Sequence, residues 1–232
     1  MASRMASLEI AGMLYAVLNG RLRSRMALQP IINLDSKVVI GHEALFRIER
    51  HPELDPTDLW SEATRTGVLE SLEDLVAQLC ADLPRTDGLL FVNADPRSAG
   101  VVDRWRHHER VVVELSEAAR IPDSLVHGLE EAGISYAVDD VGSGQANLGA
   151  LVRMHPAYIK VDRSIVDGCH RDPQKAAMLG VLAQYASDIG AHLIAEGVEV
   201  AGEAATLRRI GVPFGQGYLF GKPVIGKGRR RA

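Results

Sequence analysis

From Leu89 onward the chain alternates short apolar runs with longer amphipathic segments. Runs such as Val111–Leu115, Ile134–Val138 and Tyr158–Val161 have the length and composition of buried strands. The segments between them are long enough for helices, and several end at a glycine such as Gly133, which is a common helix stop. This alternation predicts parallel strands with helices packed outside them.

The beginning of the chain has a different pattern. An irregularly spaced apolar face along Leu8–Met26 predicts a helix. Two strand-like runs follow it, Ala27–Leu34 and Val38–Phe46. The short link between these runs, 35–37, permits only antiparallel pairing. The first strand is therefore expected to run against all the others.

Together these patterns predict an α/β fold, a (β/α)8 TIM-like barrel with the first strand antiparallel. The predicted strands are 27–34, 38–46, 89–92, 111–115, 134–138, 158–161, 192–195 and 214–218. The predicted helices are 8–26, 57–65, 68–83, 122–132, 146–154, 173–189 and 201–210. A doubly wound open sheet is the alternative for the same order of elements.

Polar residues stand at the ends of many predicted strands. They are Glu43, Asn93, Glu114, Asp139, Asp140, Lys160, Glu196 and Gln216. In a barrel all parallel strands end at one rim, so these side chains would converge there. In an open sheet they would be spread along an edge, and this difference favours the barrel.

Length and composition indicate the class of protein. With 232 residues, 47% hydrophobic and 24% charged, the chain is expected to form one soluble globular domain. We predict a helical lead-in at 1–26, the barrel at 27–225 and a basic tail at 226–232. Two cysteines are too few to stabilise a chain of this length by disulfide bonds, which indicates a reducing compartment. The early apolar run Ile10–Leu18 is too short to span a bilayer. A cytoplasmic protein without a membrane span is therefore expected. Basic residues do not form a stripe with aromatic ones, which argues against binding of polymeric nucleic acid.

The residue types at the predicted rim indicate a metal site. Carboxylates and amides without histidine or cysteine are the oxygen ligands that Mg²⁺ and Mn²⁺ prefer, with Ca²⁺ as a further candidate. The adjacent Asp139 and Asp140 would repel each other unless a cation or a shared proton lay between them. Enough acids are present for two ions joined by a bridging carboxylate, an arrangement suited to cleaving a phosphoester. Each residue alone has an ordinary explanation as a turn or a solvated strand end, so the prediction depends on their joint placement.

Eight short segments form an ordered set along the chain. They are Gln29-Pro30-Ile31, Glu43-Ala44-Leu45, FVN at 91–93, VELSE at 113–117, Asp139-Asp140, IKVDRS at 159–164, AEGVE at 195–199 and QGYLFGKP at 216–223. The set resembles the EAL-domain cyclic di-GMP phosphodiesterase family, whose name comes from the tripeptide at 43–45. The resemblance covers roughly 29–223, and the ordered set is far more specific than the tripeptide alone.

The resemblance implies a site with two divalent ions, Mg²⁺ or Mn²⁺. The ligands that it implies for one ion are Glu43, Asn93, Glu114 and Asp139. Asp139 would bridge to a second ion that also meets Asp140 and Glu196. The residues that it implies to be catalytic are Lys160, which would orient the hydrolytic water, together with Glu43 and Glu196.

Further residues are implied to bind substrate or to support the ligands. Those that would contact substrate or order the site are Gln29, Arg47 and Gln216. Those that would support the ligands through hydrogen bonds are Glu117, Glu199 and Asp162, with Glu117 pinning the loop after the aspartate pair.

The loop after the aspartate pair departs from the family pattern. Val141 stands where the family usually has Phe, and Gln-Ala-Asn at 145–147 replaces an aromatic residue and two serines. Loss of ring packing at Val141 would cost about 1 kcal/mol or more if that position is buried. Ser116 and His42 replace the usual Thr and Tyr, and His42 is a candidate for pH sensitivity. No implied ligand is missing.

The activity implied by the resemblance is hydrolysis of cyclic di-GMP to linear pGpG by metal-activated water. The unusual loop motivates an alternative, a catalytically weak or inactive EAL domain acting as a cyclic di-GMP receptor or protein-interaction module. A third hypothesis is a metal-dependent barrel hydrolase for a different phosphodiester. The resemblance also implies a homodimer. Because no sensor, receiver or cyclase segment is recognisable, regulation is expected from a partner protein, from domains lost from this chain or from self-association.

Overall fold

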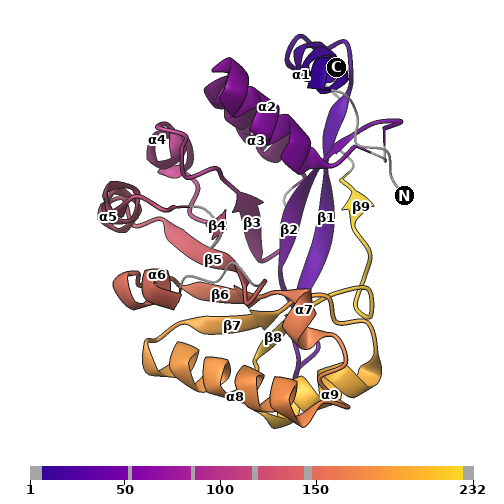
Figure 1. The fold of residues 1–232 in the computed structure, drawn as a ribbon, viewed down its shortest axis with the longest axis vertical. Coiled ribbons are helices and arrows are strands. Elements are labelled where there is room, and N and C mark those ends of the chain that lie inside the picture. The colour runs from indigo at the N-terminus through magenta and orange to yellow at the C-terminus, as the bar shows by residue number, and fades with distance from the viewer. Residues whose placement is uncertain (1–6, 52–53, 85–86, 117–119, 144–147, 227–232) are drawn as a thin grey trace.

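The computed structural model describes residues 7–51, 54–84, 87–116, 120–143 and 148–226, and its centre is a barrel of strands with helices arranged around it (Figure 1). The strands are β1 (Ser24–Asn33), β2 (Val39–Ile48), β3 (Leu89–Asn93), β4 (Val111–Ser116), β5 (Ser135–Val141), β6 (Tyr158–Val161), β7 (His192–Ala195), β8 (Phe214–Gln216) and β9 (Val224–Ile225). The helices are α1 (Ser7–Leu18), α2 (Pro56–Thr66), α3 (Leu69–Ala81), α4 (Val101–Trp105), α5 (Asp123–Glu131), α6 (Leu148–Arg153), α7 (Arg163–Val166), α8 (Pro173–Asp188) and α9 (Ala201–Arg209).

The strand order closes the sheet into a barrel of eight strands. Strands β2 to β8 follow one another in sequence order and pair in parallel. Strand β1 is antiparallel to β2 on one side and to β8 on the other, and so joins the two ends of the sheet. The prediction of a (β/α)8 barrel with an antiparallel first strand is therefore confirmed, and the open sheet is excluded. The short β9 was not predicted; it pairs with β1 beside β8.

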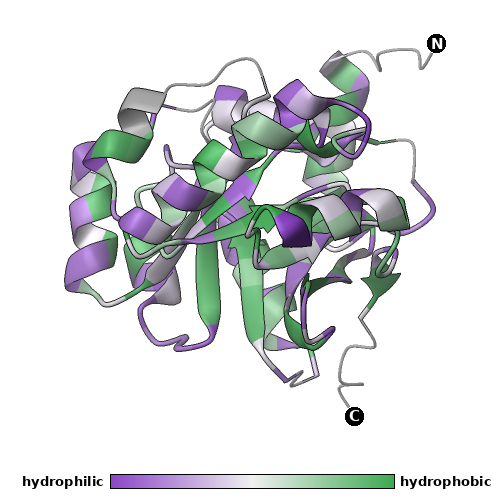
Figure 2. Ribbon diagram, turned by 90° about the horizontal axis from the view of Figure 1, so that it is seen from below, coloured by the Kyte–Doolittle hydropathy of each residue, from purple (hydrophilic) through white to green (hydrophobic). Residues whose placement is uncertain are grey.

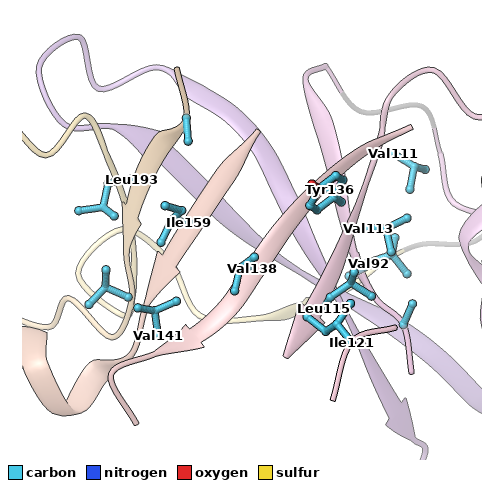
Figure 3. Packing of buried hydrophobic residues seen from close by; sticks show 14 of the residues in the cluster. Val92, Val111, Val113, Leu115, Ile121, Tyr136, Val138, Val141, Ile159 and Leu193 are labelled. Carbon is cyan, nitrogen blue, oxygen red and sulfur yellow. The ribbon is translucent and has the colours of Figure 1, made fainter. Parts of the chain in front are cut away.

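Apolar side chains pack on both faces of the barrel wall, which explains why the strands are nearly continuous apolar runs. The inside of the barrel is filled by a small cluster of fully buried residues, Ile31, Phe91, Val112, Ala137 and Ile194. The residues that alternate with these, such as Val113, Val138 and Ile159, point to the outer face and pack in the larger core under the helices (Figure 3). Figure 2 shows the strands mostly in the hydrophobic colour and the helices with mixed colours, as expected for helices with one solvated face.

Local signals in the sequence explain where the long helices begin and end. Asp55 precedes α2 and accepts a hydrogen bond from the Thr57 amide at 2.9 Å, while Gly67 ends the helix with a φ of 74°. Asp172 caps α8 in the same way by accepting from two amides of its first turn. No helix in the described part of the chain has the length and hydropathy to cross a membrane.

Several elements differ from the predictions. The first helix ends at Leu18 and not at Met26, because the chain turns at Gly20, whose φ is 74°. The four-residue α7 and five-residue α4 were not predicted, since one turn of helix leaves too short a periodic signal. Glu43 was expected at a strand end, but β2 continues to Ile48 by pairing with β1 beyond the end of β3.

Candidate functional site

Each barrel strand, or the residue directly after it, places one polar side chain next to the apolar residues that fill the barrel. Within a strand the polar residue usually follows a filling residue by two positions, as Glu114 follows Val112 and Asp139 follows Ala137, so both share the inward face. The complete layer is Gln29, Glu43, Asn93, Glu114, Asp139, Lys160, Glu196 and Gln216. All of these residues except Gln29 were expected to converge at the rim, and the structure brings them together; Asp140, also expected there, lies beside the layer and lines the same cavity.

Lys160 lies at the centre of the layer and is fully buried. Its Nζ is 2.7 Å from Glu114 Oε1, 2.7 Å from Glu196 Oε1, 3.2 Å from Asp139 Oδ2 and 3.7 Å from Glu43 Oε2. One ammonium group thus faces four carboxylates. If all four were ionised, the buried group would carry an excess of negative charge.

Amide side chains hold Glu43 in place. Asn93 Nδ2 donates to Glu43 Oε1 at 3.1 Å, and Gln216 Nε2 donates to Glu43 Oε2. Gln216 Nε2 also lies 3.1 Å from Gln29 Oε1, and Gln29 in turn donates to the Gly221 carbonyl at 3.2 Å. These contacts join β1, β2, β3 and β8 around one carboxylate.

Asp140 has an unusual backbone conformation directly after Asp139. Its φ is 63°, which is unusual for a residue with a side chain, and its amide donates to Asp139 Oδ1 at 2.9 Å. Ser116 Oγ donates to Asp140 Oδ2 at 3.1 Å. The predicted strand ends at Val138, before the aspartate pair. In the structure β5 continues to Val141, so the pair lies within the strand.

Burial dominates the electrostatics of the layer. Loss of solvent raises the pKa of Asp139 to about 6 and that of Glu196 to about 8, and raises the pKa of Glu114 well above its usual range. Burial alone would lower the pKa of Lys160, but the surrounding carboxylates outweigh it and raise that pKa, so Lys160 keeps its proton. The acids are therefore costly to ionise without additional positive charge.

Two groups of oxygen ligands fit divalent cations. Ligand atoms of Glu43, Glu114 and Asp139 lie within 4.8 Å of one another, and so do those of Asp139, Asp140 and Glu196. Both carboxylate oxygens of Glu114 are buried without a hydrogen-bond partner in the described structure, since the close contact with Lys160 lacks hydrogen-bond geometry. Hard oxygen donors with this charge suit Mg²⁺ or Mn²⁺, and Asp139 belongs to both groups.

A cavity of about 380 Å³ opens over these groups. The described residues that line it are Gln29, Glu43, Leu45, Asn93, Asp139, Asp140, Arg163, Glu196, Gly197, Glu199, Gln216, Gly217 and Tyr218. Five of them were not predicted as site residues: Leu45, Arg163, Gly197, Gly217 and Tyr218. All five lie inside the short segments quoted above, within two positions of predicted residues, so position along the chain was the only signal that could have indicated them.

Other predicted site residues lie apart from the polar layer. Arg47 lines a neighbouring cavity of about 490 Å³ and donates to the Phe46 carbonyl at 2.7 Å. Asp162 caps α7 by accepting from the Ser164 amide at 2.9 Å. Glu199 lines the main cavity and pairs with Arg163. Glu117 and residues 145–147 lie outside the described residues.

Two of the positions that differ from the family pattern, Val141 and His42, lie in the described part of the structure as buried or half-buried residues. Val141 is 1% exposed, so the condition for a packing loss at this position is met. His42 has a pKa lowered by burial, and its Nδ1 is buried without a hydrogen-bond partner in the described structure.

Comparison with known proteins identifies the family. The model of the EAL domain matches residues 14–223, which is most of the chain. The chain belongs to the EAL domain family. A curated relative is the bifunctional diguanylate cyclase/cyclic di-GMP phosphodiesterase MucR of Pseudomonas aeruginosa, 26% identical over 222 residues, with 84% of this chain and 32% of MucR covered. The chain thus spans about a third of that relative's length.

Two solved structures resemble this chain along most of its length. The PaMucR phosphodiesterase in complex with cyclic di-GMP is 26% identical, with a TM-score of 0.78 and coverage of 94% of this chain and 98% of that one. BlrP1 of Klebsiella pneumoniae, in a complex with manganese and cyclic di-GMP, is 28% identical, with a TM-score of 0.74 and coverage of 88% and 57%. Cyclic di-GMP is therefore bound in both of these relatives, and manganese is present with it in BlrP1.

Proposed function

We propose that the protein is a metal-dependent phosphodiesterase that hydrolyses cyclic di-GMP to linear pGpG. The observation that carries this proposal is the pair of oxygen-ligand groups that share Asp139 beneath one cavity. Two ions in these groups would lie close together, as in enzymes that cleave phosphoesters with two metals. The relatives named for this activity, or solved with this ligand, support the choice of substrate.

The ligands that we propose for the first ion are Glu43, Asn93, Glu114 and Asp139, and those for the second are Asp139, Asp140 and Glu196. The amide nitrogen of Asn93 is engaged by Glu43, which leaves its carbonyl oxygen as the ligand atom. When bound, Mg²⁺ or Mn²⁺ supplies Lewis acidity that activates a water molecule and offsets charge on the phosphoryl oxygens.

The protein's own side chains position the reacting groups. Lys160 keeps its proton at Nζ, so it acts as a charged hydrogen-bond donor that orients the attacking water and not as a base. Gln216 and Asn93 fix both oxygens of Glu43, which keeps this ligand aimed at the ion. Gln29 and Gln216 line the cavity and can also contact the substrate, and Arg47 would reach it from the neighbouring cavity.

The receptor alternative has one supporting observation. Val141 is buried where the family usually places a larger ring, and it follows the aspartate pair directly. Looser packing there would leave Asp140 less fixed and slow turnover while still permitting binding. Binding of cyclic di-GMP without product would favour this alternative, and a panel of other phosphodiesters would test the third hypothesis.

The decisive experiment is a turnover assay with the purified protein in Mg²⁺ or Mn²⁺, followed by chromatography of the products. We expect conversion to pGpG that stops on addition of EDTA. Glu43→Ala should abolish turnover, whereas Glu109→Ala, a matched change at an exposed glutamate, should not. Absence of product with both metals, in folded wild-type protein that binds the dinucleotide, would contradict the proposal.

The proposal also covers the location, oligomeric state and domain organisation of the protein. We expect a cytoplasmic homodimer whose activity is regulated by a partner protein, with a lead-in at 1–26, the barrel at 27–225 and a basic tail at 226–232. Light scattering tests the dimer, and co-purification tests the regulatory partner.

A further inference from the structure

Arg163 is the only positively charged residue among the described residues that line the main cavity. It begins α7, directly after the cap residue that follows β6. Its side chain is 55% exposed, so the guanidinium group can reach a bound ligand. Lys160, the other cation of the site, is fully buried and forms ion pairs with carboxylates of the layer.

The position of the Arg163 side chain is fixed by two neighbours. Its aliphatic stem packs on Gly197, where an added Cβ would lie 2.5 Å from Arg163 Cγ, and Gly197 also has a φ of 64°. Its Nη1 lies 2.9 Å from Glu199 Oε1. A side chain at 197 would push the guanidinium group away from the end of β7, so this glycine is what permits its placement.

The two loops that carry Arg163 and Glu199 are joined by a buried carboxylate. Glu203 is 2% exposed and accepts hydrogen bonds from the Gly168 amide at 2.9 Å, the Glu199 amide at 2.9 Å and the Val200 amide at 3.2 Å. On the other side, Lys175 Nζ donates to two carbonyls of the α7 segment. The guanidinium group is therefore held on a rigid support at the cavity wall.

We propose that Arg163 binds the phosphate of the cyclic dinucleotide that is not being hydrolysed. This inference rests on the proposed function. A cyclic dinucleotide has two phosphodiesters, and the ligand groups around Asp139 can take only one of them. Among the described residues that line the cavity, Arg163 alone offers a positive charge to the second phosphodiester. A guanidinium group can donate two parallel hydrogen bonds to phosphate oxygens, which a lysine cannot do.

The test compares two substrates and four proteins. The proteins are the wild type, Arg163→Ala, Arg163→Lys and the control Arg171→Ala, an exposed arginine that does not line the cavity. The substrates are cyclic di-GMP and bis(4-nitrophenyl) phosphate, which has a single phosphodiester. Calorimetric titration with cyclic di-GMP in Ca²⁺, with chromatography to verify that the ligand stays intact, measures binding separately from turnover.

We expect Arg163→Ala to weaken binding of cyclic di-GMP about tenfold, the loss of one charge-assisted contact. The ratio of kcat/KM for cyclic di-GMP to that for the single phosphodiester should fall by a similar factor. Arg163→Lys should lie between the wild type and Arg163→Ala, and Arg171→Ala should match the wild type.

Equal losses on both substrates, or Arg163→Ala binding as tightly as Arg171→Ala, would overturn the role of Arg163. If the wild type binds cyclic di-GMP without cleaving it, the hydrolase proposal fails and the binding comparison alone decides on Arg163. If the wild type does not bind cyclic di-GMP at all, both proposals fail.

Discussion

Lys160 and Glu114 face each other inside the barrel, with Nζ 2.7 Å from Oε1 and neither side chain more than 1% exposed. The contact joins β6 to β4 across the barrel interior. Because three further carboxylates surround the same ammonium group, its removal would leave several acids without a positive neighbour.

Lys160→Met should destabilise the metal-free protein and make it more dependent on metal. Removing one partner of a buried ion pair typically costs about 3 kcal/mol or more of unfolding free energy, since the remaining charge stays buried. Divalent ions that bind the native cluster would then recover stability by mass action. Thermal unfolding in EDTA and in Mn²⁺ measures both effects. A Tm increase by Mn²⁺ no larger than in the wild type would contradict this account.

Ser116→Ala should weaken metal binding without unfolding the protein. Ser116 donates to Asp140 Oδ2, and loss of a partner that orients a ligand typically lowers metal affinity about 10- to 100-fold. Calorimetric titration with Mn²⁺ gives the affinity directly. Ser187→Ala, at an exposed position on α8, is the control and should bind Mn²⁺ like the wild type.

Glu73 should make stability depend on pH through a site remote from the ligand groups. Burial raises its pKa to about 7, although Trp60 Nε1 donates to its Oε1 at 2.7 Å and the Asp95 amide at 3.3 Å. The folded state therefore favours the protonated acid. The contribution of protonated Glu73 to the unfolding free energy is fully present below the unfolded pKa of about 4.5. This contribution is lost as the pH rises through about 7.

Glu73→Gln imitates the protonated acid at every pH. The unfolding free energy of this variant minus that of the wild type should grow by roughly 2 to 3 kcal/mol between pH 4.5 and pH 8. Urea denaturation across this range measures the difference, in which the contributions of other carboxylates cancel. A constant difference would show that Glu73 is ionised in the folded protein.

Two glycine substitutions should act in opposite directions. An added Cβ at Gly217 would lie 2.1 Å from the Val198 carbonyl oxygen, so Gly217→Ala must displace the segment that carries Gln216. We expect a loss of stability of about 2 kcal/mol or more and a loss of cyclic di-GMP turnover. Gly180 on α8 has no atom within 4 Å of an added Cβ, so Gly180→Ala should stabilise the protein by about 0.5 to 1 kcal/mol. Urea denaturation of both variants tests the contrast.

The fold could be predicted where apolar runs have clear limits. Strands β6 and β7 have the predicted bounds, because a compact apolar run stands before a polar residue in each. The end of β2 could not be predicted, since its extension depends on pairing with β1 and not on its own pattern. The early apolar helix was predicted too long because its pattern continues into residues that belong to β1.

The candidate site could be predicted as a set of residues but not as a geometry. In β4, β5 and β6 the polar residue stands two positions after an apolar residue that points into the barrel. This spacing brings Glu114, Asp139 and Lys160 to the inner face of the barrel. The contact of Arg163 with Glu199 could not be read from the sequence, because it depends on where the segment after β7 lies. Distances between strands decide this contact, and a linear pattern carries no information about them.

The seam between β1 and β8 consists of three residue pairs, and it brings Gln29 next to Gln216, 187 positions further along the chain. Contacts over such a separation form late in folding because the loss of chain entropy must precede them. A nascent chain on the ribosome therefore lacks the part of its cavity wall formed by Gln216, Gly217 and Tyr218 until β8 emerges. A chain that ends before β8 would lack Gln216 and its contact with Glu43, so the site could not take its complete form during synthesis.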